Sequence, residues 1–382
     1  MHQVIIIGAG PAGAFLAYLL ARAKISVLLL EKERLPRYKL CAGGVSPKAC
    51  RFVDFSLEPV IEDEISTVVL THNQTRPITI TRDLPVVYTV SRDRFDAFLV
   101  DRAVEAGAEV RDRVRINKVE VTGDGVSVSA AGKQWDGLFL AGADGAFSVV
   151  ARTLRLARKK RVAITLEKEV PVSPERLARN RGRIKVDYGL APGTFTWVFP
   201  KADRLSLGAG SISPRFKGLH SLLGKVIHAE GLADSVSVLT ARGWIIPYNP
   251  KPDNLHRGRA LVVGDAAGLA DALTGEGIYA ALYSARLAAE VISAQMRKLQ
   301  PDLREYTDLV RRTLGPEMLT AYRIARLFYP APGLFHRFLE RQPDLADAFI
   351  RTVAGDLTYA EFFRSCIKRF PTAFLKTAHK LS

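Results

Sequence analysis

Cysteine is scarce in this chain, and the three that occur do not have the spacing of a metal site. Cys41, Cys50 and Cys366 form no Cys-X-X-Cys pair and no cluster with histidine. This pattern argues against a structural zinc site, and we expect the protein to bind no metal. So few cysteines are typical of a reducing compartment, and a cytoplasmic location is predicted.

Other signatures are missing as well. The chain has no Gly-X-Ser-X-Gly, no His-Glu-X-X-His and only seven histidines, so the sequence indicates no hydrolase. The net charge of +16 comes without a zinc finger or an RNA-binding motif, and we expect no nucleic-acid partner. Lysine and arginine spread over a solvated surface explain this charge as well as a functional basic face does.

Long hydrophobic runs of the kind that span a membrane are also missing. Residues 4–21 carry no charge, but glycine and proline interrupt them repeatedly between positions 8 and 13, and no basic segment precedes them. This pattern is typical of a strand, a tight loop and a helix. Neither a membrane span nor a signal peptide is predicted.

The N-terminus does contain a strand–helix–strand unit. A short β-branched run predicts a buried strand over Gln3–Ile7, a helix-forming stretch covers Ala14–Ala23, and an apolar run predicts a second strand over Ser26–Leu30. The loop after the first strand reads Gly-Ala-Gly-Pro-Ala-Gly. It is a Gly-X-Gly-X-X-Gly motif in the setting where that motif binds a dinucleotide.

Each glycine of this loop is expected at its position for a physical reason. Gly8 permits the tight turn, Gly10 lets the backbone approach a pyrophosphate, and Gly13 lets helix and strand pack closely. The helix N-terminus offers free N–H groups to the phosphates. Glu31, at the end of the second strand, can accept hydrogen bonds from a ribose diol.

Two later segments indicate that the dinucleotide is FAD. Residues 138–152 read as a buried strand that enters a glycine-rich turn at Asp144. Residues 259–281 deliver Gly264 and Asp265 to a loop of small residues in the same way. An aspartate at such a strand end can hydrogen-bond a ribityl hydroxyl while the backbone lies against the cofactor. Three segments of this kind, in this order, predict an FAD-dependent oxidoreductase.

With these segments the sequence resembles the flavoproteins of the p-hydroxybenzoate hydroxylase fold, and among them the geranylgeranyl reductase family. The specific matches are LPRYKLCAGG at residues 35–44, similar to the flavin-side segment PRYKxCGGG; VSRDRFD at 90–96, similar to VxRxxFD; FTWVFPK at 195–201, similar to the cavity strand YxWxFPK; and DALTGEGI at 271–278, similar to DPLTGEGI. The sequence departs from the family pattern at Leu40, Ala42, Phe195 and Ala272. Phe195 stands where a tyrosine is usual, which removes a hydroxyl from the expected cavity.

The resemblance implies which residues form the site. Cofactor contacts are expected from Gly8, Gly10, Ala12, Gly13, Glu31, Lys32, Cys41, Ala42, Arg92, Asp144, Gly264, Asp265, Gly275, Gly277 and Ile278. Phe195, Trp197 and Phe199 alternate along one predicted strand, so they share a face and are expected to bind substrate. Cys41 is the candidate catalytic residue, because its counterpart lies near the isoalloxazine, and Arg37 and Lys39 would favour its thiolate. A small, buried, inert cysteine is the alternative interpretation.

The resemblance also implies an α/β architecture, α+β overall, with interleaved parts. A Rossmann-like FAD-binding domain is expected from residues 1–59, 84–157 and 252–298. A β-sheet substrate-binding domain is expected from residues 60–83 and 158–251. Residues 299–382 are predicted to form a helical C-terminal region whose helices are broken at Pro316, Pro330, Pro332, Pro343 and Pro371.

Members of this family reduce isolated double bonds in isoprenoid chains, which implies the same reaction class here. A hydride from reduced flavin goes to one alkene carbon and a proton to the other, and NADPH or ferredoxin is the expected external reductant. Because an isolated alkene is a poor electrophile, alignment and proton delivery must carry much of the catalysis. The C-terminal region combines arginines with aromatic residues, which fits either contact with an anionic bilayer or a helical lid with a basic outer face.

Three other functions fit parts of the sequence. An FAD-dependent monooxygenase shares the fold but typically acts on polar aromatics with O₂. A flavin-dependent halogenase needs a lysine soon after the first strand–helix–strand unit, and none occurs between Lys48 and Lys118. A non-enzymatic FAD-binding or scaffold protein would be favoured by loss of Glu31, Asp144 or Asp265, and all three are present.

Overall fold

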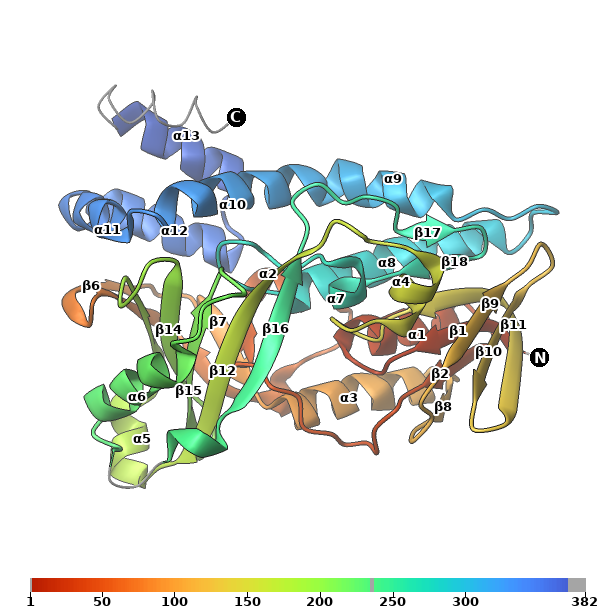
Figure 1. Ribbon diagram of the computed structural model, residues 1–382, viewed down its shortest axis with the longest axis horizontal. Helices are drawn as coiled ribbons and strands as arrows, with labels where there is room; N and C mark the ends of the chain where they lie inside the picture. Colours follow the sequence, from red (N-terminus) through yellow and green to blue (C-terminus); the bar gives the residue numbers. More distant parts are fainter. Residues whose placement is uncertain (1, 234–236, 370–382) are drawn as a thin grey trace.

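The protein is described here by a computed structural model covering residues 2–233 and 237–369. Figure 1 shows two large β-sheets next to each other, with the C-terminal helices along one side of both. The chain passes between the two sheets more than once, so each sheet takes strands from distant parts of the sequence. This mixed α/β architecture with a helical C-terminal region is the predicted one.

The first sheet has the parallel core of a dinucleotide-binding fold. Its strands are β1 (His2–Ile7), β2 (Val27–Leu30), β8 (Glu109–Arg111), β9 (Lys118–Val121), β10 (Val126–Ala130), β11 (Lys133–Gly142), β17 (His256–Arg257) and β18 (Ala260–Val262). The order is β17-β18-β11-β1-β2-β8, and the β9–β10 hairpin extends β11. Because β1 pairs in parallel with both β2 and β11, the loops that follow these three strands meet at one edge of the sheet.

Helices pack on this sheet and hold the glycine-rich turn. They are α1 (Pro11–Arg22), α2 (Pro47–Cys50), α3 (Arg92–Glu105), α4 (Val149–Leu154), α7 (Gly264–Ala267) and α8 (Ile278–Gln295). The predicted strand–helix–strand unit is confirmed, with α1 starting at Pro11 rather than Ala14. A proline fits there because the first turn of a helix has no intrahelical partner for its N–H groups.

The second sheet has seven strands. They are β5 (Thr67–His72), β6 (Thr75–Thr81), β12 (Arg161–Pro171), β13 (Arg183–Tyr188), β14 (Thr194–Pro200), β15 (Arg204–Ser211) and β16 (Arg242–Tyr248), in the order β16-β12-β15-β14-β13-β5-β6. Apolar side chains on one face pack against α6 (Leu219–Ala229), and α5 (Pro174–Asn180) lies in the same half of the molecule. A third sheet joins β3 (Gly44–Val45), β7 (Val87–Val90) and β4 (Ile61–Ile65), and η1 (Glu58–Val60) and η2 (Val238–Thr240) are short 3₁₀ turns.

The last described helices are α9 (Arg304–Thr313), α10 (Gly315–Phe328), α11 (Pro332–Arg341), α12 (Pro343–Ala354) and α13 (Tyr359–Arg369). Helices α10, α11 and α12 pack against the second sheet on the side away from α6, and α13 packs on α10 and α12. The helices are interrupted at these prolines as predicted: Pro330 lies in a turn, and Pro316, Pro332 and Pro343 lie in the first turn of the following helix, for the reason given for α1. Pro371 lies outside the described residues. Within residues 2–233 and 237–369, no helix is long and apolar enough to cross a membrane.

Candidate active site

One cavity of about 1350 Å³ extends from the glycine-rich turn to the C-terminal helices. Gly10 and Glu31 border one end of it, and Phe195, Phe328 and Ile350 border the other. Pockets for a single small ligand measure about 300–1,000 Å³. The cavity therefore has room for a dinucleotide and a second ligand in contact with it.

The glycine-rich turn is closely packed on one side and open on the other. Gly8 has a φ of +102°, and a Cβ there would lie 2.3 Å from the Ala143 carbonyl oxygen. A Cβ on Gly13 would lie 1.9 Å from the Gly8 carbonyl oxygen. Gly10 faces the cavity, and among the described residues only the Arg37 guanidinium comes within 4 Å of a Cβ placed on it. The loop therefore leaves space for a ligand where the N-terminus of α1 begins.

Glu31 is buried at the end of β2 and organises this turn. Its carboxylate accepts hydrogen bonds from the N–H groups of Ala9 (2.8 Å) and Glu33 (3.1 Å). The Arg37 Nε lies 3.2 Å from the same carboxylate. The acid predicted to receive a ribose thus borders the cavity beside the glycine-rich loop.

A buried ion cluster connects α3 to the flavin-side segment 35–44. Arg92 donates to Asp96 through Nε (2.8 Å) and Nη2 (2.9 Å), and Arg37 Nη1 lies 3.1 Å from the same carboxylate. Burial opposes the charge on Arg92, but Asp96 raises the pKa of Arg92 and keeps it charged. Arg92 was predicted from its motif, whereas Asp96 was not, although its spacing of four residues on a helix is the signal for such a pair.

Two aspartates meet the cavity at strand ends. Asp144 Oδ2 accepts from the Val149 and Val150 N–H groups (2.6 and 3.3 Å), while its Oδ1 is buried without a partner among the described residues. Asp265 borders the cavity, and burial raises its pKa, with Lys39 opposing the shift. A buried polar atom without a partner needs a hydrogen bond from something outside the chain. The Asp144 carboxyl group therefore fits a bound polar cofactor, and Asp265 borders the same cavity.

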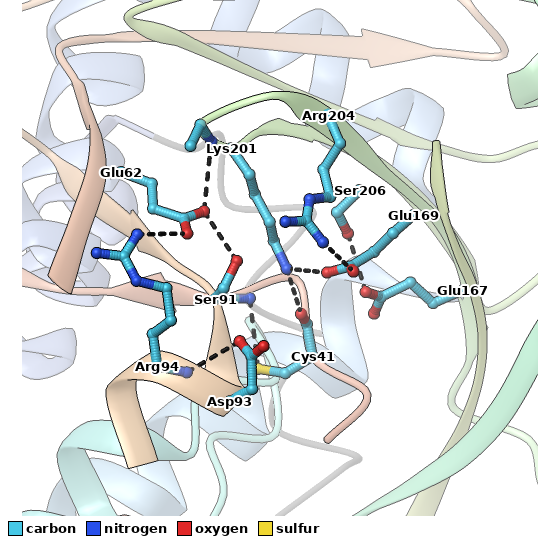
Figure 2. Close-up of polar contacts among 12 residues, drawn as sticks. Cys41, Glu62, Ser91, Asp93, Arg94, Glu167, Glu169, Lys201, Arg204 and Ser206 are labelled. Atoms are coloured by element: carbon cyan, nitrogen blue, oxygen red, sulfur yellow. Dashed lines mark hydrogen bonds and ion pairs between the residues drawn. The ribbon is translucent and has the colours of Figure 1, made fainter. Parts of the chain in front are cut away.

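The loop around Cys41 is attached to the second sheet by a buried lysine. Lys201 is 1% exposed, donates to the Cys41 carbonyl oxygen at 3.4 Å and pairs with Glu169 (Figure 2). The Cys41 sulfur accepts from the Gly43 N–H at 3.4 Å and contacts Arg92. The neighbours of this sulfur thus present N–H groups to it.

The other two thiols lie in different surroundings. Burial raises the pKa of Cys50 to about 11 and that of Cys366 to about 12, so both stay protonated at neutral pH. Such thiols are poor nucleophiles.

Aromatic side chains line the far part of the cavity. Phe195, Trp197 and Phe199 all border it from β14, as their alternation predicts. Two glycines on the neighbouring strand β15 make room for the rings. A Cβ on Gly208 would lie 1.9 Å from the Trp197 ring, and one on Gly210 would lie 2.3 Å from the Phe195 ring. Residues of α10, α11 and α12 close this chamber from the other side.

All residues predicted to contact the cofactor border the cavity except Gly13 and Gly264. Gly13 packs α1 on the turn. A Cβ on Gly264 would lie 3.1 Å from the Ala12 Cβ and 3.5 Å from the Ala281 Cβ, so Gly264 allows α1 and α8 to approach each other. The sequence did not indicate Glu167, a buried cavity residue of β12. Its signal in the sequence is weak, because Glu167 and Glu169 alternate with Lys168 as on a solvated strand face.

Comparisons with known proteins agree with this geometry. Residues 1–186 match a family model described as an FAD binding domain. The chain is 32% identical over 331 residues to an uncharacterized protein of Methanosarcina barkeri, covering 86% of this chain and 84% of that protein. It is 27% identical over 380 residues to the chloroplastic geranylgeranyl diphosphate reductase of Nicotiana tabacum, covering 93% and 80%.

A solved structure shares the whole fold. The geranylgeranyl bacteriochlorophyll reductase-like protein of Thermoplasma acidophilum superposes with a TM-score of 0.76 and 21% identity, covering 100% of this chain and 99% of that one. At this identity the likeness establishes the fold, including the helical C-terminal region.

Proposed function

This chain belongs to the geranylgeranyl reductase family of FAD-dependent flavoproteins, and from that premise we propose that it reduces carbon–carbon double bonds in a geranylgeranyl or other polyprenyl chain. The observation that carries the proposal is the continuity of the cavity. A polar end shaped for a dinucleotide opens directly into an apolar chamber between the second sheet and the C-terminal helices.

The chamber suits a hydrocarbon chain. Phe195 and Trp197 form one wall, and Ile324, Phe328 and Ile350 form part of the opposite wall. Burial of apolar surface supplies about 25 cal/mol per Å², so a long isoprenoid gains affinity without polar contacts. The departure at Phe195 makes this wall more apolar than the tyrosine usual in the family would.

Reduced FAD supplies a hydride when it is bound. The chain itself must hold the alkene in place, exclude water and deliver a proton. The aromatic wall on β14 serves the first two purposes. The N-terminus of α8 also borders the cavity and places the positive end of an 18-residue helix there, which favours negative charge on a bound group. Cys41 borders the cavity between the two ends and remains our candidate reactive group on the flavin side.

The C-terminal helices form the lid of the chamber, and their outer surface fits contact with a lipid. Leu334 on α11 and Ile367 on α13 are exposed large apolar residues. Arg337 and Arg341, both on α11, are exposed as well. A lipid-tailed substrate would reach the chamber from such a surface. The reducing equivalents would come from NADPH or ferredoxin.

The test is turnover without oxygen. Purified protein is loaded with FAD, reduced with dithionite in an anaerobic chamber and mixed with geranylgeranyl diphosphate, and the product is analysed by mass spectrometry. We expect a gain of two hydrogens for each bond reduced. A product that forms only with ¹⁸O₂ and carries ¹⁸O would establish a monooxygenase instead. Protein loaded with FAD but left oxidised is the control.

A further inference from the structure

Glu167 is an acidic residue in the wall of the chamber. It lies in the middle of β12, where Gly208 of β15 and Arg242 of β16 are its partners across the sheet. Its side chain borders the cavity, yet the residue is only 1% exposed. Burying a carboxyl group costs free energy unless the group is hydrogen-bonded or paired with an opposite charge. The groups around Glu167 therefore determine what it can do.

A short hydrogen-bonded chain fixes the orientation of this carboxyl group. The Trp197 Nε1–H donates to Ser206 Oγ at 3.3 Å, and the Ser206 hydroxyl donates to Glu167 Oε1 at 3.1 Å. Among the described residues, no hydrogen bond reaches Oε2. One oxygen is thus held by the sheet beside an aromatic residue of the substrate wall, and the other is left for the chamber.

Two cationic side chains in this region already pair with a different acidic residue. Lys201 and Arg204 both pair with Glu169, two residues farther along β12 (Figure 2). Lys39 and Tyr38 face Glu167 from the flavin-side loop, and Arg242 lies on the adjacent strand. Burial raises the pKa of Glu167 to about 7, with Lys201 and the Ser206 hydrogen bond opposing the shift and Glu169 adding to it. A protonated carboxyl group is therefore available near neutral pH.

We propose that Glu167 is the proton donor of the alkene reduction, an inference that rests on the proposed function. The π bond of the substrate breaks, one carbon receives the hydride from the reduced cofactor, and the other forms a C–H bond with the proton of the Glu167 carboxyl group. The carboxylate that remains faces Lys201 and Lys39 and regains a proton from water before the next turnover. The cofactor is oxidised and the alkene is reduced, so atoms and electrons balance.

Two neighbouring groups are less suited to this role. Burial and the nearby Glu167 raise the pKa of the Tyr38 phenol, which makes it a weaker acid. The Cys41 sulfur accepts a hydrogen bond from Gly43 and contacts the Arg92 guanidinium, so its surroundings favour an acceptor. Glu167 is a stronger acid than Tyr38, and Cys41 is left with a role on the flavin side.

The first test is Glu167→Gln, which keeps the shape and the acceptor for Ser206 but removes the acidic proton. A positioned general acid contributes about 10²–10⁴-fold, so we expect kcat to fall by that factor while FAD content and KM stay close to those of the unchanged protein. Glu167→Asp should restore part of the rate, because it restores an acid. Glu120→Gln, an exposed substitution on β9, is the control and should leave the rate unchanged.

A second readout does not depend on turnover. Infrared spectra of the oxidised holoenzyme should show the C=O stretch of a protonated carboxyl group that disappears as the pH rises through neutrality and is missing in Glu167→Gln. In the active protein, kcat should fall over the same pH range. Glu169→Gln should move both transitions to lower pH, because Lys201 then faces Glu167 alone.

The outcomes separate the two proposals. If the unchanged protein reduces the polyprenyl chain and Glu167→Gln does so equally fast, Glu167 is not the proton donor and the proposed function stands. An infrared band that is present in both proteins would likewise overturn the assignment. If the unchanged protein does not reduce the substrate at all, both proposals fail together.

Discussion

Removal of the charge on Asp96 tests whether the buried ion cluster supports the flavin site. The carboxylate is fully buried, accepts two hydrogen bonds from Arg92 and forms an ion pair with Arg37. Asp96→Asn removes the carboxylate that pairs with Arg92 and leaves Arg37 paired with Glu31. Breaking a buried pair in this way costs about 3–5 kcal/mol.

The cost converts to a measurable shift in melting temperature. An unfolding entropy of about 2.1 cal/mol/K per residue over 382 residues amounts to roughly 0.8 kcal/mol/K, so Tm should fall by roughly 4–6 °C. Because Arg37 and Arg92 border the cavity, FAD affinity should fall as well. Circular dichroism follows unfolding, and flavin fluorescence follows release of the cofactor. Asp93→Asn, exposed in the first turn of α3, is the matched control. Equal melting temperatures for the two variants would show that the ion cluster does not stabilise the fold.

Three further substitutions give distinct results. Asp265→Ala removes a carboxyl group from the cavity wall and should weaken FAD binding in a fluorescence titration by about 1–3 kcal/mol, roughly 5- to 150-fold. In the same titration, Asp136→Ala, a substitution at an exposed residue, should bind FAD like the unchanged protein. Gly208→Ala places a methyl group against the Trp197 ring and should lower the free energy of unfolding in urea by about 1–3 kcal/mol. Gly123→Ala should be tolerated, because no atom of the described residues lies within 4 Å of the new Cβ. Equal losses in the two variants would contradict the packing of this wall. The raised pKa of Glu167 means that its contribution to stability is complete below the unfolded pKa near 4.5 and is lost as the pH rises through about 7. Between pH 5 and pH 8, the Tm of the unchanged protein should therefore decline relative to that of Glu167→Gln. Parallel curves of Tm against pH would exclude this titration.

The parts of the site that sequence reasoning predicted are set by local constraints. The turn at Gly8 and Gly13 needs glycine because backbone atoms lie within 2.3 Å of any added Cβ, and that requirement is visible in the spacing of the motif. The aromatic face of β14 follows from the two-residue period of a strand. Both features depend on residues that are close together in the chain.

The parts that it did not predict depend on distant elements. Glu167 lies in a Leu-Glu-Lys-Glu-Val run that looks like a strand with one solvated face. That face is buried because Tyr38 and Lys39, from the distant flavin-side segment, and Lys201, which follows β14, lie around Glu167. Gly264 matched a cofactor motif, but the packing of α1 against α8 decides its role. The prolines of the C-terminal region signal helix boundaries without telling whether a helix ends or begins there.

Single-turnover absorbance shows whether reduced FAD on this protein passes its electrons to a polyprenyl double bond. The FAD-loaded protein is reduced until its band near 450 nm disappears and is then mixed with geranylgeranyl diphosphate in a stopped-flow instrument without oxygen. We expect the oxidised flavin band to return in proportion to the double bonds saturated, each with a gain of two hydrogens. A flavin that stays reduced until oxygen is admitted would contradict it.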